Sequence, residues 1–378
     1  MVRGKEIDDS FIFDDLWEKK MEKEKISKNL TQIWVTMFQW PIPINGLAVG
    51  DLTGDGFLEI AGVSDDHFLR VFNHTGKELW KKDLFDAVIF SKIGNLISKE
   101  DNNVLVGGAD KLLHVFDKDG NEVWNKKSRK WWYNAKIIDI NKDGVNEIIA
   151  GSRDRSLYCL NGKTGEEIWL HEFDAYIKYL DAIDNMVAAA ADDGIVKIFD
   201  EKGTEKFSDE LNERVLYCEI LKHDNINYLG VASAEGEFKI YNIDDNKIIF
   251  EKEIEEIITS FKFTNKIKNQ LSVLLGDNNA FLYNMNIKGD KLWEISTEEE
   301  NYCIELGDIQ SRGVEDIIVG GKDSKLRILN SEDGTVRSYY SLDNFTTNII
   351  LADIDNDGHL EIVTSGRDRT IRVFREKI

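Results

Sequence analysis

The sequence predicts an all-β fold, a closed β-propeller of eight blades, and three observations lead to this prediction. One repeated unit fills almost the whole chain of 378 residues, and each unit has the pattern of a four-stranded antiparallel sheet. The last copy lacks one strand, which a segment near the N-terminus can supply. Self-similarity at a period of about 40 to 45 residues is typical of propeller blades.

The repeated unit is clearest in residues 139–173, DINKDGVNEIIAGSRDRSLYCLNGKTGEEIWLHEF. Short apolar or alternating strands are separated there by turns rich in Asp and Gly, the pattern of an antiparallel meander. An aromatic position in the last strand recurs at steps of 44, 45, 38, 43, 43 and 45 residues. Its seven copies are Trp80, Trp124, Trp169, Phe207, Phe250, Trp293 and, without the aromatic ring, Ser338.

The eighth copy, residues 348–378, ends after its third strand. The segment NLTQIWVTMF can supply the fourth strand, because Trp34 precedes Trp80 by 46 residues; Trp17 is the competing donor and fits the spacing less well. We therefore expect residues 33–38 to pair with the strand that ends near Phe374. Closure removes exposed sheet edges, whereas the alternative, an open solenoid, needs polar caps. The predicted organisation is a charged extension over residues 1–28 and one propeller over residues 29–378.

Charge and composition exclude several classes of protein. With 48 basic and 70 acidic residues the net charge is −22, a poor match for a polyphosphate backbone, so nucleic acid is not an expected partner. No apolar run is long enough to span a bilayer, and acidic residues stand where a signal peptide has its apolar core, which predicts a cytosolic protein without a transmembrane segment. The three cysteines form no CxxC pair, so neither a metal cluster nor a disulfide framework is expected.

Two motifs within the repeat resemble known propeller repeats. The loops DLTGDGFLEIAG, DINKDGVNEIIAG and DIDNDGHLEIVTSG resemble the FG-GAP or VCBS repeat of integrin-α-like propellers. The turns FNHTGKELW, FDKDGNEVW and LNGKTGEEIW resemble the repeat of quinoprotein-like (PQQ-like) propellers. Both resemblances imply a propeller, and neither implies one function, because such repeats occur in adhesion proteins, scaffolds and enzymes. No Trp-Asp pair occurs, so the chain is not a typical WD40 protein.

The Asp-Gly loops of blades 1, 3 and 8 carry oxygen side chains at positions 1, 3, 5 and 9, with glycine at position 6. Such a set can converge on a hard cation, so we expect structural calcium, with magnesium as the other candidate. An EF-hand is excluded because its closing glutamate stands at position 12 and its loop joins two helices. The same residues also suit metal-free turns. The candidate ligands are Asp51, Thr53, Asp55 and Glu59; Asp139, Asn141, Asp143 and Glu147; and Asp353, Asp355, Asp357 and Glu361. In blade 7, Arg312 stands where a cation is expected.

Strand direction places these loops on one face and the inter-blade links, with the turns between second and third strands, on the other. The link before blade 3, KKSRKWWYN, combines cations with aromatic rings in an otherwise acidic chain. Aromatic residues and arginine dominate protein interfaces, although such rings can also be interior plugs between blades. The predicted partner-binding residues are Lys126, Lys127, Arg129, Lys130, Trp131, Trp132 and Tyr133, together with Arg153 and Arg155 of the next turn.

These features favour a protein-interaction scaffold over an enzyme. The six histidines are scattered among the repeats, and there is neither an adjacent cysteine pair nor a recognisable cofactor-binding set. The alternatives are an enzyme acting at the central channel, as in quinoprotein dehydrogenases or polysaccharide lyases, and an extracellular adhesion module.

Overall fold

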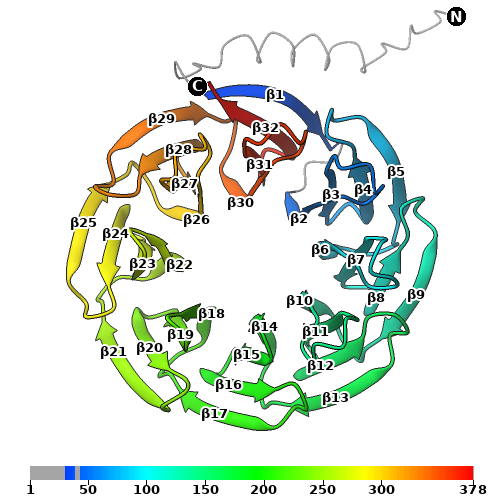
Figure 1. The fold of residues 1–378 in the computed structure, drawn as a ribbon, viewed down its shortest axis with the longest axis horizontal. Coiled ribbons are helices and arrows are strands. Elements are labelled where there is room, and N and C mark those ends of the chain that lie inside the picture. The colour runs from blue at the N-terminus through cyan, green and yellow to red at the C-terminus, as the bar shows by residue number, and fades with distance from the viewer. Residues whose placement is uncertain (1–29, 39–42, 378) are drawn as a thin grey trace, which may run out of the picture.

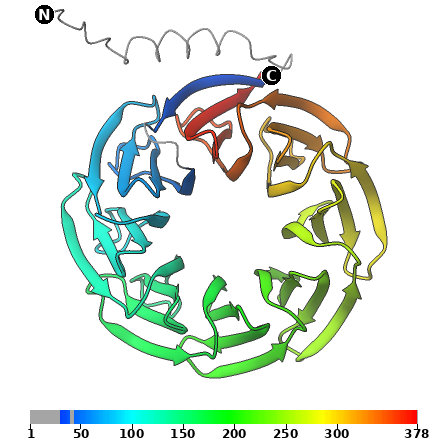
Figure 2. The ribbon, with the colours of Figure 1, turned by 180° about the vertical axis from the view of Figure 1, so that it is seen from behind.

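The computed structural model describes residues 30–38 and 43–377, so the predicted extension over residues 1–28 lies outside the described residues. Eight four-stranded antiparallel sheets stand in a ring around one axis, as Figures 1 and 2 show from opposite sides. The predicted eight-bladed propeller is confirmed. No helix within the described ranges is long and apolar enough to cross a bilayer.

Blades 1 to 4 each follow the chain from the innermost to the outermost strand. Blade 1 has β2 (Ile44–Gly50), β3 (Glu59–Ser64), β4 (Phe68–Phe72) and β5 (Glu78–Asp83); blade 2 has β6 (Val88–Gly94), β7 (Asn103–Gly108), β8 (Leu112–Phe116) and β9 (Glu122–Lys127); blade 3 has β10 (Trp132–Ile138), β11 (Glu147–Ser152), β12 (Ser156–Asn161) and β13 (Glu167–Glu172); blade 4 has β14 (Ile177–Ile183), β15 (Met186–Ala191), β16 (Ile195–Asp200) and β17 (Glu205–Glu210).

Blades 5 to 7 repeat this order, and blade 8 completes it with a strand from the N-terminal region. Blade 5 has β18 (Val215–His223), β19 (Ile226–Ser233), β20 (Glu237–Asn242) and β21 (Lys247–Glu253); blade 6 has β22 (Ile258–Ile267), β23 (Gln270–Asp277), β24 (Phe281–Asn286) and β25 (Lys291–Ser296); blade 7 has β26 (Asn301–Gly307), β27 (Asp316–Gly321), β28 (Lys325–Asn330) and β29 (Val336–Ser341); blade 8 has β30 (Thr346–Ala352), β31 (Glu361–Gly366), β32 (Thr370–Glu376) and β1 (Leu30–Met37).

Ring closure follows the prediction. β1 pairs antiparallel with β32 from Leu30 opposite Glu376 to Met37 opposite Thr370, with one register shift between Gln32 and Trp34. In Figure 1 this strand lies on the outer rim of the last blade, so the two ends of the described chain meet in one sheet. Pairing of this kind leaves blade 8 with the same outer edge as the other blades.

The core lies between neighbouring blades. Ile149 and Cys159 of blade 3, for example, pack in one buried cluster with Ala189 and Phe199 of blade 4. Middle strands such as β11 are buried along their whole length, whereas in outermost strands such as β9 exposed residues alternate with half-buried ones over most of the strand. The predicted strand pattern arises because a blade buries both faces of its inner strands and exposes its rim.

Candidate interaction face

The connections lie on two faces, as strand direction predicts. On one face, which we call the link face, the turn between β11 and β12 bonds to the preceding inter-blade link, since the Arg153 amide donates to the Trp131 carbonyl at 2.8 Å. On the opposite face, the loop face, the carboxylate loops meet the turns between third and fourth strands; the Gly162 amide donates to the Asn146 carbonyl at 3.1 Å.

A pocket of about 630 Å³ lies on the link face between blades 2, 3 and 4. We call it the basic pocket, because five of its eight lining residues are cations and one is acidic. Its lining is Lys111, Arg129, Lys130, Trp131, Arg153, Asp154, Arg155 and Tyr176. The structure therefore brings together five of the predicted partner-binding residues, namely Arg129, Lys130, Trp131, Arg153 and Arg155.

Arg153 lies against two aromatic rings in the basic pocket. Its guanidinium carbon lies 4.8 Å from the ring centroid of Trp131 and 5.3 Å from that of Tyr176, within the range of cation–π attraction. Arg129 lies 3.6 Å from Glu172. Arg153, Lys130 and Lys111 have no carboxylate within ion-pair distance in residues 30–38 and 43–377. Asp154 is already engaged, since it accepts hydrogen bonds from the Arg129 amide at 3.1 Å and the Tyr158 hydroxyl at 2.9 Å. The pocket thus presents unneutralised positive charge beside an aromatic wall.

Trp132 does not belong to this surface, which corrects the prediction. Its side chain is 0% exposed, its ring packs 4.9 Å from that of Tyr158, and its Nε1 donates to the Lys111 carbonyl at 3.2 Å. Trp131, its neighbour, is 37% exposed. Trp132 is therefore a plug between blades, the alternative that the sequence left open.

Three other predicted residues lie beside the basic pocket rather than in its lining. Tyr133 is half-buried, with its ring 6.4 Å from that of Tyr176 and 5.6 Å from the Lys178 ammonium. Lys126 and Lys127 lie on β9, the outermost strand of blade 2, where they pair with Leu113 and Leu112.

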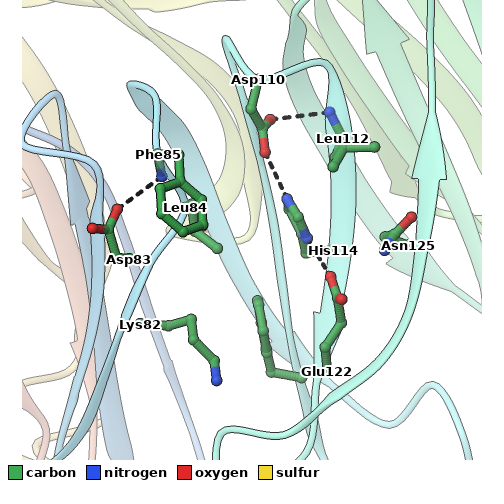
Figure 3. Close-up of a pocket in the computed structure, with 10 residues that line it drawn as sticks. Lys82, Asp83, Leu84, Phe85, Asp110, Leu112, His114, Glu122 and Asn125 are labelled. Carbon is green, nitrogen blue, oxygen red and sulfur yellow. Dashed lines mark hydrogen bonds and ion pairs between the residues drawn. The ribbon is translucent and has the colours of Figure 1, made fainter.

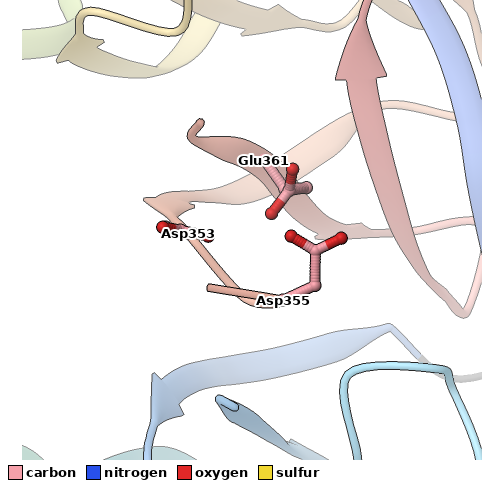
Figure 4. A group of neighbouring side chains, drawn as sticks. All are labelled: Asp353, Asp355 and Glu361. Atoms are coloured by element: carbon pink, nitrogen blue, oxygen red, sulfur yellow. The ribbon is translucent and has the colours of Figure 1, made fainter. Parts of the chain in front are cut away.

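On the loop face, three of the four predicted ligands of blade 8 converge, whereas Asp357 is not part of the cluster (Figure 4). Carboxylate oxygens of Asp353, Asp355 and Glu361 all lie within 4.8 Å of one another. The Arg375 guanidinium already supplies a positive charge there: it lies 2.6 Å from Asp355, 3.0 Å from Asp357 and 2.5 Å from Glu361. One oxygen of Asp355, Oδ1, is buried without a hydrogen-bond partner among the described residues. An ion in this loop would have to compete with Arg375.

In blade 1 the loop contains oxygen atoms that suit a cation. The Glu59 carboxylate is buried and accepts hydrogen bonds from the amides of Leu52 and Thr53 at 2.9 and 3.0 Å. Burial raises the pKa of Glu59 above its usual value, and the charges of Asp55 and Asp51 add to this, against the effect of the two amides. The hydroxyl of Thr53 is buried and has no hydrogen-bond partner among the described residues. These residues fit an oxygen-coordinated cation, which would supply the missing positive charge.

The loop of blade 3 has the same backbone form, but its candidate ligands are more fully engaged in contacts within the protein. Asp139 accepts hydrogen bonds from the amides of Asp143 and Gly144 at 3.1 and 2.8 Å. The Asn141 side-chain amide donates to Glu147 at 3.2 Å. The Lys99 ammonium lies so close to Gly144 that a Cβ added at this glycine would come within 2.1 Å of it. In blade 7, Arg312 pairs with Asp316 at 2.7 Å, a fixed cation where the sequence suggested one. Calcium binding by the three loops stays a prediction.

Sequence reasoning missed a second pocket, which extends from the link before blade 2 along β8 and β9 (Figure 3). This pocket, of about 470 Å³, lies between blades 1 and 2, and we call it the Phe85 pocket. It is lined by Lys82, Asp83, Leu84, Phe85, Asp110, Leu112, His114, Phe116, Glu122 and Asn125. The sequence signal was an aromatic residue in the link DLFDAV, like those in other links, but nothing in the sequence indicated that this ring is exposed.

The innermost strands carry charges that pair across neighbouring blades. Lys136 of blade 3 lies 2.6 Å from Asp181 of blade 4. Lys262 of blade 6 lies 3.8 Å from Glu219 of blade 5 and 3.1 Å from Glu305 of blade 7. Asp181 and Glu219 also accept hydrogen bonds from backbone amides of the next blade's inner strand, at 3.1 and 2.6 Å. These groups serve to cap the inner sheet edges and join the blades.

Comparison with known proteins agrees on the architecture. No protein-family model and no curated protein matches the sequence. Among solved structures, Saccharomyces cerevisiae Sqt1 matches with a TM-score of 0.74 and 11% identity over 93% of this chain and 100% of that one. BamB from Moraxella catarrhalis matches at 0.66 and 16% over 92% and 97%. BBS1N in complex with ARL6DN matches at 0.60 and 11% over 91% and 97%.

These likenesses show the fold alone. They support the β-propeller repeat class to which both sequence motifs pointed. The finer resemblance of the carboxylate loops to FG-GAP or VCBS repeats rests on the loop residues themselves.

Proposed function

We propose that this chain is a non-catalytic scaffold that binds an acidic protein partner on the link face of blades 2 and 3. The basic pocket is the observation that carries the proposal. In a chain of net charge −22, five cations gather at one site, and Arg153 stands between two aromatic rings without a carboxylate partner in the described residues.

The composition of the basic pocket suits protein recognition. Tryptophan, tyrosine and arginine are enriched among interface hot spots, and truncating such a residue costs about 2 kcal/mol or more. Complementary charge also speeds the encounter and disfavours basic competitors. A fold of the same class, BBS1N, was solved in complex with ARL6DN, which is consistent with a binding role.

We include in the proposal that the chain is not an enzyme. Both ring nitrogens of His114 are engaged, Nε2 with Asp110 at 2.7 Å and Nδ1 with Glu122 at 2.5 Å. The acidic groups on the innermost strands are held by lysines and backbone amides. We assign these groups structural roles, as ties within and between blades.

Calcium is a separate, structural part of the proposal. The loop of blade 1 would hold an ion with Asp51, Thr53, Asp55 and Glu59, and the bound ion would supply positive charge beside the buried glutamate. Its role is to tie the first two strands of the blade together on the loop face, away from the basic pocket.

Affinity capture from the protein's own cell extract tests the proposed function. The double variant Arg129→Glu and Lys130→Glu should lose the partner that the wild type retains, because both residues line the basic pocket and both are exposed. The matched control is Lys118→Glu and Lys163→Glu, which reverses two exposed charges in turns of the loop face. Equal loss in both variants, or capture unchanged in the first, would refute the assignment to this face.

A further inference from the structure

The basic pocket and the Phe85 pocket share one turn of blade 2. Asp110 lines the Phe85 pocket, and the next residue, Lys111, lines the basic pocket. The turn is fixed to both neighbouring links: the Ala109 amide donates to the Ala87 carbonyl at 2.8 Å, and the Lys111 carbonyl accepts from the Ser128 amide at 2.9 Å. The two pockets therefore adjoin at this turn of the link face.

Phe85 is held in an unusual conformation. Its φ is +64°, a left-handed value that is unfavourable for a bulky side chain, and its side chain is 87% exposed. The Phe85 amide donates to Asp83 at 2.8 Å, which fixes the turn (Figure 3). Phe85 therefore combines backbone strain with an exposed apolar ring, and strained residues of this kind cluster at active sites and ligand-binding sites.

The Phe85 pocket combines apolar lining residues with a histidine that is hydrogen-bonded to two carboxylates. The apolar residues of its lining are Leu84, Phe85, Leu112 and Phe116. His114 lies between Asp110 and Glu122; burial opposes its charge, but the hydrogen bonds to the two carboxylates raise the pKa of His114 above its usual value. The His114 ring is thus held by the protein's own carboxylates, and the apolar lining beside Phe85 suits an apolar side chain.

We propose that the link face of blades 1 to 3 binds one extended protein segment with two elements of recognition. An apolar side chain of the segment lies against Phe85 in the Phe85 pocket, and acidic side chains beyond it lie in the basic pocket. This inference rests on the proposed function and deepens it, since it states which sequence chemistry the partner carries: an apolar anchor a few residues from a cluster of Asp or Glu.

The two elements contribute in different ways. Burying an apolar anchor and the Phe85 ring removes apolar surface from water, so the anchor determines how long the partner remains bound. The acidic residues pair with Arg129, Lys130, Arg153 and Arg155, which are exposed or half-buried, so their contribution weakens as salt is added. The binding of a bipartite segment should therefore persist at a salt concentration that abolishes binding of acidic residues alone.

Synthetic peptides provide the test by fluorescence anisotropy with the full chain. The bipartite peptides carry one leucine, a Gly/Ser spacer and five glutamates, with the spacer varied from about two to eight residues because an extended chain advances about 3.3 Å per residue. In the matched acidic peptide serine replaces the leucine, and in the matched apolar peptide glutamine replaces each glutamate. We expect the best bipartite peptide to bind about 30-fold more tightly than its acidic counterpart.

The variant Phe85→Asn separates binding from folding. Asparagine tolerates the left-handed conformation better than phenylalanine, so the melting temperature should stay equal or rise. The same variant should abolish the advantage of the bipartite peptide and leave binding of the acidic peptide unchanged. Retention of the bipartite advantage in Phe85→Asn, or equal binding of the bipartite and acidic peptides to the wild type, overturns the proposal.

Failure of the proposed function gives a different result. Suppose that the bipartite peptide binds no better than the acidic one while Arg129→Glu with Lys130→Glu still abolishes partner capture. That result supports the proposed scaffold function and refutes only the apolar anchor at Phe85. If that charge reversal leaves capture unchanged and no acidic peptide binds, both the proposed function and the bipartite binding mode are wrong.

Discussion

The indole Nε1 of Trp80, on the last strand of blade 1, donates a hydrogen bond of 2.8 Å to the backbone carbonyl of Lys118 in blade 2. The ring also covers Gly120, whose φ is +80°, so closely that a Cβ there would lie 2.9 Å from the indole. The same bond to the next blade is made by Trp34, Trp124, Trp169 and Trp293. The repeated tryptophan and the repeated glycine turn in the sequence are thus two halves of one contact between blades.

Replacing Trp80 tests this contact. Trp80→Phe, which imitates the natural Phe207 of blade 4, should lose the hydrogen bond and about 1 kcal/mol of unfolding free energy. Gly120→Ala should cost about as much or more, because alanine strains the left-handed turn and meets the indole. Denaturant unfolding measures both, and an unchanged midpoint for Gly120→Ala would show that the contact contributes nothing.

Two truncations test ring closure. Removing residues 1–28 leaves β1 intact and should leave the melting temperature unchanged. Removing residues 1–40 deletes β1 with Leu30, opens the edge of β32 and uncovers the buried cluster around Phe374. We expect the longer truncation to aggregate in size-exclusion chromatography, and equal behaviour of both proteins would contradict the closure described above.

One substitution tests whether Arg375 occupies the place of a calcium ion in the loop of blade 8. Arg375→Met removes the charge that faces three carboxylates, so it should lower the unfolding free energy by about 2 kcal/mol in chelator. Because the loop then has the ligand set of a calcium site, millimolar calcium should restore much of the loss. Lys163→Met, at an exposed turn of the same face, serves as the control.

The wild type gives the complementary result for blade 1. Calcium should raise its melting temperature, and Thr53→Val together with Asp55→Asn should remove this response. If the wild-type melting temperature is the same in chelator and in calcium, and anomalous scattering locates no ion, the loops are simple turns.

The pH dependence of stability should reflect Glu219. Burial raises the pKa of Glu219 to about 7, although Lys262 and the Phe263 amide oppose the shift. Because the folded-state pKa is raised, this residue's contribution is complete below about pH 4.5 and is lost as the pH rises through 7. Glu219→Gln should therefore gain stability relative to the wild type between pH 5 and 8, by on the order of 1 to 3 kcal/mol. A constant difference across this range would contradict the assignment.

The fold could be predicted from the sequence because its repeats encode it locally. The spacing of the recurring last-strand position, a tryptophan in most copies, indicated the number of blades, and the missing last strand predicted the pairing of β1 with β32. Strand direction alone placed the carboxylate loops and the links on opposite faces, which the backbone bonds of Arg153 and Gly162 confirm.

The details of the sites could not be predicted in the same way. Arg375 lies 20 residues from Asp355, and only the pairing of β31 with β32 brings them together. The positive φ of Phe85 leaves no trace in a sequence, because residues other than glycine seldom adopt it. Trp131 stands in the irregular link and Trp132 begins the strand, so strand alternation could not indicate which ring is buried.

The two adjacent tryptophans offer the most direct test of the interaction face. Trp132→Ala should lower the unfolding free energy by about 3 to 5 kcal/mol, because it empties a fully buried site against Tyr158. Trp131→Ala removes a partly exposed ring from the wall of the basic pocket and should change stability by less than about 1 kcal/mol. Its effect should appear in partner capture, which we expect to weaken at least 10-fold if the ring is a hot spot. Calorimetry and capture measured on the same two variants separate the roles, and a Trp131→Ala protein that unfolds like Trp132→Ala would show that both rings belong to the core.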